Sequence, residues 1–313
     1  MFHLPEIIEF NMEKLIANEK LPSLRVGYER FSDDYKTQCF KKDMSYVESI
    51  AYACARMPAT YSAAMHVLNE FHEKVKDSHI KNVLDLGSGT GALMSAFISY
   101  GIKSEYTAVE KSINMKNISE KLIENSELRV DILNKDVFDF FKTNQKTYDS
   151  SFLIYFLNEL NDKKKILHEI DKTTENFIFV IEPGTPKGFD NIKLVKEFAQ
   201  NRSYSIIAPC ATDQCPMKHD DWCHFSVRVP RKMRHIFIKN ASLPYEDEKF
   251  SYIIVSKTHP KNFSKNRIIR RPIKKVGHTI LDICTDDGIK RIFTSNKTIN
   301  KKLLWGDELE ILE

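Results

Sequence analysis

The sequence lacks any long apolar run. No stretch approaches the roughly 20 consecutive apolar residues that a membrane-spanning helix needs, so no membrane partner is expected. An internal repeat and a low-complexity linker are also absent. What remains, with 42% hydrophobic and 29% charged residues over 313 positions, is a globular composition. It fits either one large domain with additions or two smaller domains.

An acid-poor leader is missing as well. The first twenty residues contain Glu6, Glu9, Glu13 and Glu19, whereas organelle transit peptides have few acidic residues and secretory signals have a basic start followed by an apolar core. We therefore expect a cytoplasmic protein of bacterial type rather than a protein of the mitochondrial matrix. We also expect it to be a monomer.

Acidic residues are missing from positions 257 to 275, where eight Lys or Arg occur. The net charge of +4 is small for the whole chain, so an argument for nucleic acid binding depends on this local excess. One interpretation is a solvated basic loop and strand, and the other is contact with RNA phosphates. The candidate RNA-binding residues are Arg228, Arg231, Lys232, Arg267, Arg270, Arg271, Lys274 and Lys275.

The hydrophobic pattern changes along the chain. Residues 1–77 have helical spacing, and from residue 82 short apolar runs alternate with helical stretches, which is typical of parallel βαβ units. We expect an α/β sheet protein with a helical N-terminal region at 1–77 and a sheet domain at 78–257. A cysteine-rich insertion at about 208–245 interrupts this domain. A small, basic β appendage is expected at 258–313.

Three glycines follow the first predicted strand. In "VLDLGSGTGA", Gly87, Gly89 and Gly91 stand where a strand gives way to a helix, so the backbone can approach a ligand closely and offer free N–H groups. Because Ala92 follows, the string also fits the pattern of dinucleotide-binding loops. The glycines alone therefore do not choose between cofactors.

Acidic residues around this loop favour one cofactor. Asp85 lies at the end of the first strand, and Glu110 ends the second strand, where it can accept hydrogen bonds from both ribose hydroxyls. Asp136 follows the third strand, where an adenine edge could be read. Over residues 80–183 the combination resembles class I S-adenosylmethionine-dependent methyltransferases, which implies a Rossmann-like sheet and S-adenosylmethionine as cofactor.

An evident catalytic group is absent. Amino-methylating enzymes of this class often have Pro-Pro after the fourth strand, and this chain has "IYFLNEL" there. Tyr155, Asn158 and Glu159 are candidate pocket residues, although Asn158 can equally cap the next helix. The catalytic residues stay unknown, and a catalytically inactive protein of this fold stays possible.

Cysteine is scarce, but three of the six cysteines fall within fourteen positions, at Cys210, Cys215 and Cys223. A cytoplasmic location disfavours disulfides. Pro209-Cys210 is similar to the pair that carries the nucleophile in cytosine methylation, but the neighbouring cysteines make metal ligation the better interpretation. The C-x2-C pairs of common zinc ribbons are lacking. His219, His224 and Cys284 are candidates for a fourth ligand, and spacing leaves both zinc and an iron-sulfur cluster open.

Several longer strings carry a second resemblance. They are "RMPATYSA", "DLGSGTG", "LNEL", "IEPGTPKGF", "DDWCHFSVRVPR", "LPYEDEKFSYIIVSK" and "DICTDDG", in this order from residue 56 to residue 288. In these strings the chain is similar to the methyltransferase-like proteins associated with the small subunit of mitochondrial ribosomes, a family with bacterial members. This resemblance implies a [4Fe-4S] cluster on Cys210, Cys215, Cys223 and Cys284, whereas Cys39 and Cys54 match no ligand position.

The resemblance also implies a partner, which is the small ribosomal subunit and its rRNA. The cluster is expected to be structural, because it would join the insertion to the appendage and add its binding free energy to folding. The preferred hypothesis is an rRNA methyltransferase, an assembly factor of the small subunit, or both. The alternatives are a catalytically inactive rRNA-binding assembly factor and a zinc-stabilised methyltransferase of a non-RNA substrate.

Overall fold

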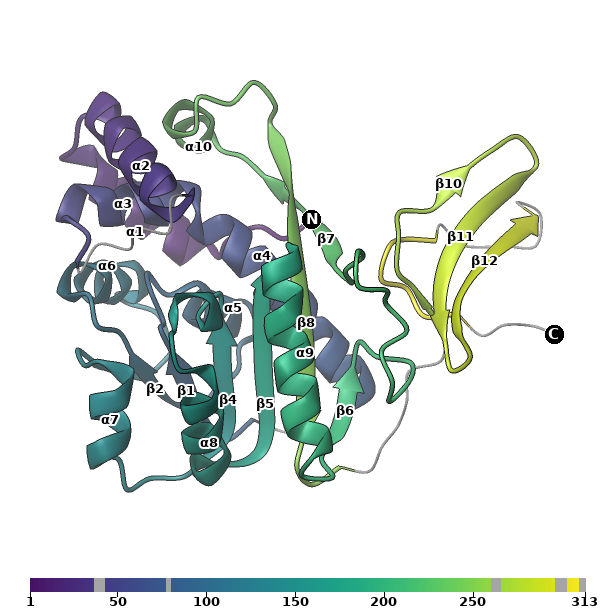
Figure 1. The fold of residues 1–313 in the computed structure, drawn as a ribbon. Coiled ribbons are helices and arrows are strands. Elements are labelled where there is room, and N and C mark those ends of the chain that lie inside the picture. Colours follow the sequence, from purple (N-terminus) through teal and green to yellow (C-terminus); the bar gives the residue numbers. More distant parts are fainter. Residues whose placement is uncertain (37–42, 77–79, 260–265, 296–302, 310–313) are drawn as a thin grey trace.

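A large mixed sheet forms the centre of the protein, with helices on both faces (Figure 1). The structure is a computed structural model that describes residues 1–36, 43–76, 80–259, 266–295 and 303–309. In this part of the chain no helix has both the length and the apolar character needed to span a membrane.

Four helices precede the sheet: α1 (Glu6–Ala17), α2 (Leu21–Lys36), α3 (Tyr46–Ala55) and α4 (Met57–Lys74). A capping box starts α3, because the Ser45 side chain accepts a hydrogen bond from Glu48 N and the Glu48 carboxylate accepts one from Ser45 N. The helical stretch is interrupted before Met57-Pro58. A new helix begins there, with proline in its first turn, where a missing N–H costs nothing.

The strands of the large sheet are ordered β3-β2-β1-β4-β5-β8-β6, and β7 also pairs with β8. The first five strands pair in parallel, and β8 runs antiparallel to β5, β6 and β7. Their bounds are β1 (Asn82–Leu86), β2 (Glu105–Val109), β3 (Val130–Leu133), β4 (Tyr148–Ile154), β5 (Thr174–Pro183), β6 (Ser205–Ala208), β7 (Phe225–Pro230) and β8 (Tyr245–Ser256). This arrangement confirms the predicted α/β fold of class I methyltransferases.

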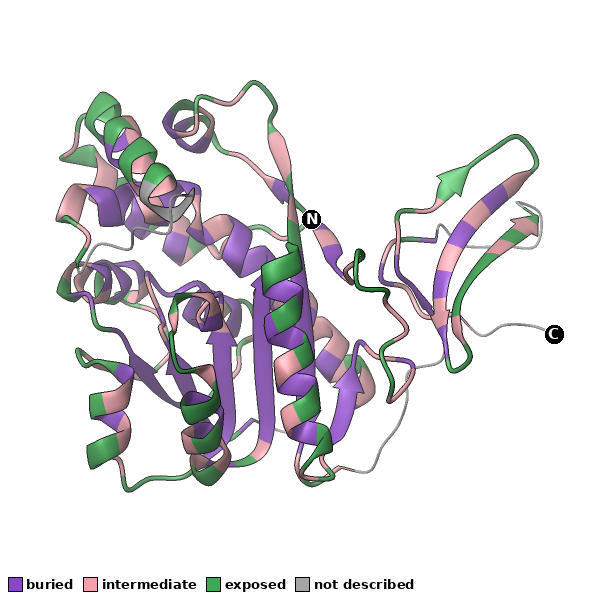
Figure 2. Cartoon of the chain, in the orientation of Figure 1, coloured by how far each residue is buried: buried purple, intermediate pink, exposed green. Residues whose placement is uncertain are grey.

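Two hydrophobic cores lie on the two faces of this sheet. Successive residues of β5 alternate between them, with Phe177 and Phe179 in one core and Ile178 and Val180 in the other. Burial on both faces explains why these strands are continuous apolar runs in the sequence (Figure 2). The connecting helices are α5 (Ala92–Tyr100), α6 (Ile113–Ile123), α7 (Val137–Thr143), α8 (Lys163–Thr173) and α9 (Pro186–Gln200), and a 3-10 helix, η1, spans Leu157–Glu159.

The cysteine-rich insertion contains two elements that the sequence patterns did not predict. Strand β7 follows the third cysteine directly, and helix α10 (Met233–Ile238) leads back to β8. Because β7 pairs with the first half of β8 and β6 pairs with its last residues, β8 is hydrogen-bonded along both edges.

A second, antiparallel sheet follows: β9 (Arg267–Ile268), β10 (Ile273–Lys274), β11 (His278–Thr285) and β12 (Gly288–Ser295). Asp286 and Asp287 form the turn between its last two strands, whose ends pair at Thr285 and Gly288. A small core that includes Ile268, Leu281 and Leu303 lies against one face of this sheet.

Candidate functional site: two cavities along one strand

A cavity of about 580 Å³ lies at the carboxyl ends of the parallel strands. Gly87 and Gly89 after β1, Glu110 after β2 and Tyr155 after β4 line it, and residues of α2 and α3 close it on the opposite side. In open α/β sheets, ligands bind outside the carboxyl ends of the strands. The volume falls within the range of small-molecule and cofactor sites, about 300–1,000 Å³.

The glycine loop borders this cavity in a left-handed conformation. Gly87 has φ +70°, and a Cβ there would lie 2.4 Å from Cδ2 of Phe156, so only glycine fits. Gly89 has φ +56°, and its Cβ would meet no atom within 4 Å. Gly91 is the residue before α5 and is not among the residues that line the cavity. The loop therefore presents Gly87 and Gly89 to the cavity.

The three predicted acidic residues have different surroundings. The Glu110 carboxylate lines the cavity and accepts hydrogen bonds from Gly89 N at 2.9 Å and Ser112 N at 2.8 Å, which leaves lone pairs for a ligand. Asp136 lies at the cavity, where its carboxylate caps α7 by accepting from Phe138 N at 2.8 Å.

The prediction that Asp85 contacts the cofactor requires a correction. It does not line the cavity, and its buried carboxylate accepts a hydrogen bond from the Tyr106 hydroxyl at 2.6 Å. Burial raises the pKa of Asp85 to about 7, with a further contribution from the nearby Glu110 charge. Asp85 therefore supports the end of β1 rather than contacting a cofactor directly.

A partly buried ion pair in the wall of this cavity was missed by the sequence reasoning. Both terminal nitrogens of Arg56 donate to the Glu248 carboxylate at 2.8 Å, and the Tyr155 hydroxyl donates to the same carboxylate at 2.6 Å. Burial opposes ionisation of Glu248, but Arg56 outweighs it and lowers the pKa of this carboxyl. Tyr155 has φ +56°, an unusual backbone conformation for tyrosine that these contacts hold in place.

Asn158 serves neither as a helix cap nor as a cavity residue. Its side-chain oxygen accepts a hydrogen bond from Asn191 Nδ2 at 2.9 Å, and Asp162 caps α8 instead. The predicted cap is therefore wrong, and the amide of Asn158 is directed away from the cavity lining. Glu159, in contrast, lines the cavity as predicted.

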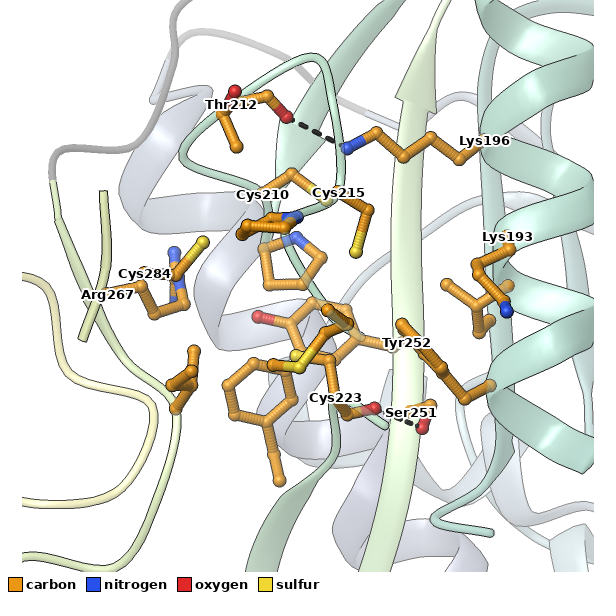
Figure 3. A pocket seen from close by; sticks show the side chains of 17 residues that line it. Lys193, Lys196, Cys210, Thr212, Cys215, Cys223, Ser251, Tyr252, Arg267 and Cys284 are labelled. Atoms are coloured by element: carbon orange, nitrogen blue, oxygen red, sulfur yellow. Dashed lines mark hydrogen bonds between the residues drawn. The ribbon is translucent and has the colours of Figure 1, made fainter. Parts of the chain in front are cut away.

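The four predicted ligand cysteines line a second, smaller cavity of about 50 Å³. Cys210 follows β6, Cys215 lies in the loop after it, Cys223 precedes β7, and Cys284 belongs to β11. Figure 3 shows the four side chains gathered around one space, with Tyr252 and Arg267 beside them. Two segments that are distant in the sequence, residues 210–223 and β11, therefore meet at this cavity.

The thiols of this cavity influence one another. Burial raises the pKa of Cys284 to about 11, and the nearby Cys210 and Cys215 raise it further. Burial and neighbouring cysteines also raise the pKa of Cys223. Within the described residues, no group of three or more His, Cys, Asp or Glu side chains is arranged to hold a metal ion.

Cysteine is the only one of His, Cys, Asp and Glu that lines this cavity among the described residues. Neither His219 nor His224 lines it; the His224 ring instead packs against Trp222 and Trp305, with centroid distances of 5.6 Å and 4.8 Å. These histidines are therefore not ligand candidates. Cys54 is a buried residue of α3 itself, and Cys39 lies outside the described residues.

One strand contributes to both cavities. Glu248 and Lys249 of β8 line the larger cavity, and Ser251 and Tyr252 line the cysteine cavity. Three cations also line the cysteine cavity: Lys193, Lys196 and Arg267. Lys196 is buried and donates to the Thr212 carbonyl at 2.8 Å.

Half of the predicted RNA-binding residues are engaged with acidic side chains. The prediction that Arg267 binds RNA requires a correction. Arg267 is 1% exposed and pairs with Glu70 at 3.0 Å and Glu308 at 2.6 Å, so it cannot reach a phosphate. Three further arginines, Arg228, Arg231 and Arg270, pair with Asp247, Glu246 and Asp221. The other four, all exposed, are Lys232, Arg271, Lys274 and Lys275.

The sheet order, the glycine loop and the cavity beside it define a class I methyltransferase-like α/β protein. Residues 46–310 match the family described as "Mitochondrial small ribosomal subunit Rsm22", and the chain belongs to this Rsm22 family. The resemblance seen in the sequence strings is thereby confirmed.

Two curated relatives illustrate the relationship. The human protein named "Ribosome assembly protein METTL17, mitochondrial" is 24% identical over 274 residues, which are 81% of this chain and 59% of the relative. The fission yeast (Schizosaccharomyces pombe) "Rsm22-cox11 tandem protein 2, mitochondrial" is 23% identical over 337 aligned positions, covering 85% and 43%. The chain thus spans about half the length of these relatives.

Similar solved structures are more distant. The plantazolicin methyltransferase BpumL with a bound substrate analogue and SAH covers 80% of this chain and 99% of its own, at 10% identity and a TM-score of 0.45. Magnesium protoporphyrin IX methyltransferase from Synechocystis PCC 6803 with bound SAH covers 77% and 100%, at 10% identity and a TM-score of 0.40.

Proposed function

We propose that this protein binds S-adenosylmethionine in the larger cavity and acts on the small ribosomal subunit, as an assembly factor that contacts rRNA and as a candidate rRNA methyltransferase. The observation that carries the proposal is that a member of the Rsm22 family has Gly89 and Glu110 facing one cofactor-sized cavity. The human relative's name, a ribosome assembly protein, supports the role in assembly.

The cofactor would be held by the chain's own polar groups. The Glu110 carboxylate would accept hydrogen bonds from the ribose hydroxyls, while its bond from Gly89 N keeps the loop close to the ligand. Asp136, at the cavity, is placed to face the adenine. When bound, the cofactor supplies an activated methyl group, for which alignment with the acceptor provides most of the rate.

Substituting Gly89 with alanine tests the cofactor site. The added methyl would enter the cavity, and overpacking of about 1–3 kcal/mol corresponds to binding of S-adenosylmethionine about fivefold to 150-fold weaker by calorimetry. The matched control is Gly101→Ala at the end of α5, which has φ +63°, also meets no atom within 4 Å, and lies outside the cavity lining.

Both variants bear a similar backbone strain of about 1 kcal/mol, so only the position of the methyl differs. Equal affinity of the two variants would place the cofactor elsewhere. Absence of binding by the unaltered protein at millimolar cofactor would overturn the cofactor proposal itself.

A non-catalytic assembly factor is the second candidate function. One observation favours it: the Asn158 amide, in the segment after the fourth strand, is bound to Asn191 and directed away from the cavity lining. Incubation of the protein with labelled S-adenosylmethionine and small-subunit rRNA separates the two functions, because only an enzyme transfers the label.

We also propose that Cys210, Cys215, Cys223 and Cys284 hold a [4Fe-4S] cluster, with zinc as the alternative. A zinc ion needs its thiolates about 2.3 Å from one point, whereas a four-iron cluster takes four cysteine ligands around a larger body. Four cysteines that line one cavity match the ligand number of such a cluster and support this proposal. Lys196 and Arg267 would offset part of the negative charge of the bound thiolates. When bound, the cluster supplies a covalent link between insertion and appendage.

Reversing the charge of Arg271 and Lys274 tests rRNA contact. The double change to glutamate should weaken binding to small-subunit rRNA and lower the slope of log K against log salt by about 1 for each phosphate contact removed. The double variant Lys103→Glu and Lys146→Glu is the matched control. These two lysines precede β2 and β4, so they lie at the amino ends of the strands of the large sheet, away from the small sheet that carries Arg271 and Lys274. An unchanged slope in the first variant would dismiss this surface.

Location and oligomeric state stay predictions. The sequence favoured a cytoplasmic monomer, whereas the named relatives are mitochondrial proteins. Fractionation of the source cells and light scattering of the purified protein would decide these two points.

A further inference from the structure

The outer face of the small antiparallel sheet carries apolar side chains. None of the residues that the structure describes covers them. Residues of β11 alternate in burial, and Thr279, Leu281 and Ile283 face the small core. The residues of β11 between these three face away from the small core. Their partners on β12 share that side, and much of β12 is exposed (Figure 2). A sheet face without a core behind it normally carries polar residues.

One row of this outer face crosses three strands. Ile273 of β10 pairs with Ile280 of β11, which pairs with Phe293 of β12. Ile273 is 47% exposed and Phe293 is 67% exposed. The His278 ring lies beside this row, with its centroid 6.0 Å from that of Phe293. We call Ile273, His278, Ile280 and Phe293 the outer row.

The charge around the outer row is positive. Between Ile268 and Ser295 the chain has six Lys or Arg and three Asp. Lys290 and Arg291 pair with Asp287 and Asp282. Arg271 and Lys274 form no ion pair within the part of the chain that the structure describes. An exposed aromatic ring on a small sheet with an excess of cations suits an anionic, planar ligand better than an apolar protein surface.

We propose that the outer row is a stacking platform for unpaired RNA bases, with Arg271 contacting the adjoining phosphates. This inference rests on the proposed function, because it specifies how the chain contacts RNA. Unpaired bases expose flat apolar faces that stack on aromatic rings, whereas a duplex hides its base faces and is read through phosphates and 2′-hydroxyls. The platform therefore selects loops and single strands.

The direct test compares Phe293→Ala with the unaltered protein. The probe is an unstructured RNA of about ten nucleotides, and the readout is fluorescence anisotropy at several salt concentrations. Loss of one stacked base weakens binding by at least about fivefold, while the salt slope stays the same because no phosphate contact is removed. Phe293→Trp should restore binding.

Phe10→Ala is the matched control. Phe10 is also an exposed phenylalanine, at 58%, with the Lys14 ammonium 4.4 Å from its ring centroid, but it lies on α1. This variant should bind the RNA as tightly as the unaltered protein. A duplex of the same sequence should bind Phe293→Ala and the unaltered protein equally.

The outcomes separate this inference from the proposed function. If the unaltered protein binds rRNA but Phe293→Ala binds the single strand equally well, the platform is dismissed and the proposed function stands. If the unaltered protein binds no RNA, the proposed rRNA contact fails first. If Phe293→Ala instead loses only a ribosomal protein partner, the outer row is a protein-docking face and the inference is overturned.

Discussion

Cys284→Ser is expected to abolish metal binding and to lower the thermal unfolding temperature by on the order of 10 °C. Cys284 is the only one of the four cavity cysteines that comes from the small sheet, so its loss would cut the link between that sheet and the insertion. The free energy of binding the metal is also free energy of folding, because the site does not exist in the unfolded chain.

The measurements are iron, acid-labile sulfide and zinc per chain on protein purified without oxygen, followed by thermal unfolding. Four irons and four sulfides per chain, roughly, would identify a [4Fe-4S] cluster. One zinc without colour would support the alternative. Cys54→Ser is the control. Cys54 is a buried residue of α3 and lies outside the cysteine cavity, so this variant should leave the metal content unchanged. Full metal content in Cys284→Ser would remove this residue from the ligand set.

Arg267→Met should lower the free energy of unfolding at neutral pH by about 3–5 kcal/mol. The arginine is 1% exposed and neutralises Glu70 and Glu308, so its removal takes the main counterion from Glu70, which is only 14% exposed. Burial raises the pKa of Glu70, but Arg267 outweighs it and lowers that pKa below its ordinary value of 4.5. This contribution is present above pH 4.5 and is lost as the pH falls through the lowered value.

The difference in stability between Arg267→Met and the unaltered protein should therefore shrink as the pH falls below about 4.5. Urea unfolding at pH 7 and at pH 4 measures it. Arg228→Met is the matched control, because Arg228 pairs with Asp247 at 2.8 Å but is 41% exposed, and such a pair contributes about 1 kcal/mol or less. Equal losses in the two variants would contradict the role assigned to Arg267.

Local patterns in the sequence predicted most of the fold. Apolar runs between helical stretches identify parallel strands, because buried strands have no polar face. The same logic missed β7, which lies among cysteines, prolines and charged residues and pairs only with β8. A strand whose partner is distant in the sequence leaves little local signal.

The candidate site was predictable only in part. The glycine loop and Glu110 are local signals, but the partners Arg56 and Glu248 are 192 residues apart, and no periodicity relates them. Arg267 was misassigned because a basic run looks the same whether a residue faces solvent or carboxylates. Only the pairing of β9 with β11 places Arg267 beside Cys284, in the interior.

Strand β8 couples the two cavities, because a change of length in this strand can affect both. Glu248 and Tyr252 stand four positions apart on the same side of this strand, about 13 Å along it, and each belongs to a different cavity. Because side chains alternate, a single-residue insertion or deletion before Glu248 would turn both to the opposite face of the sheet. One change of length in this strand can therefore disturb the two sites together, although most of their other lining residues come from different segments.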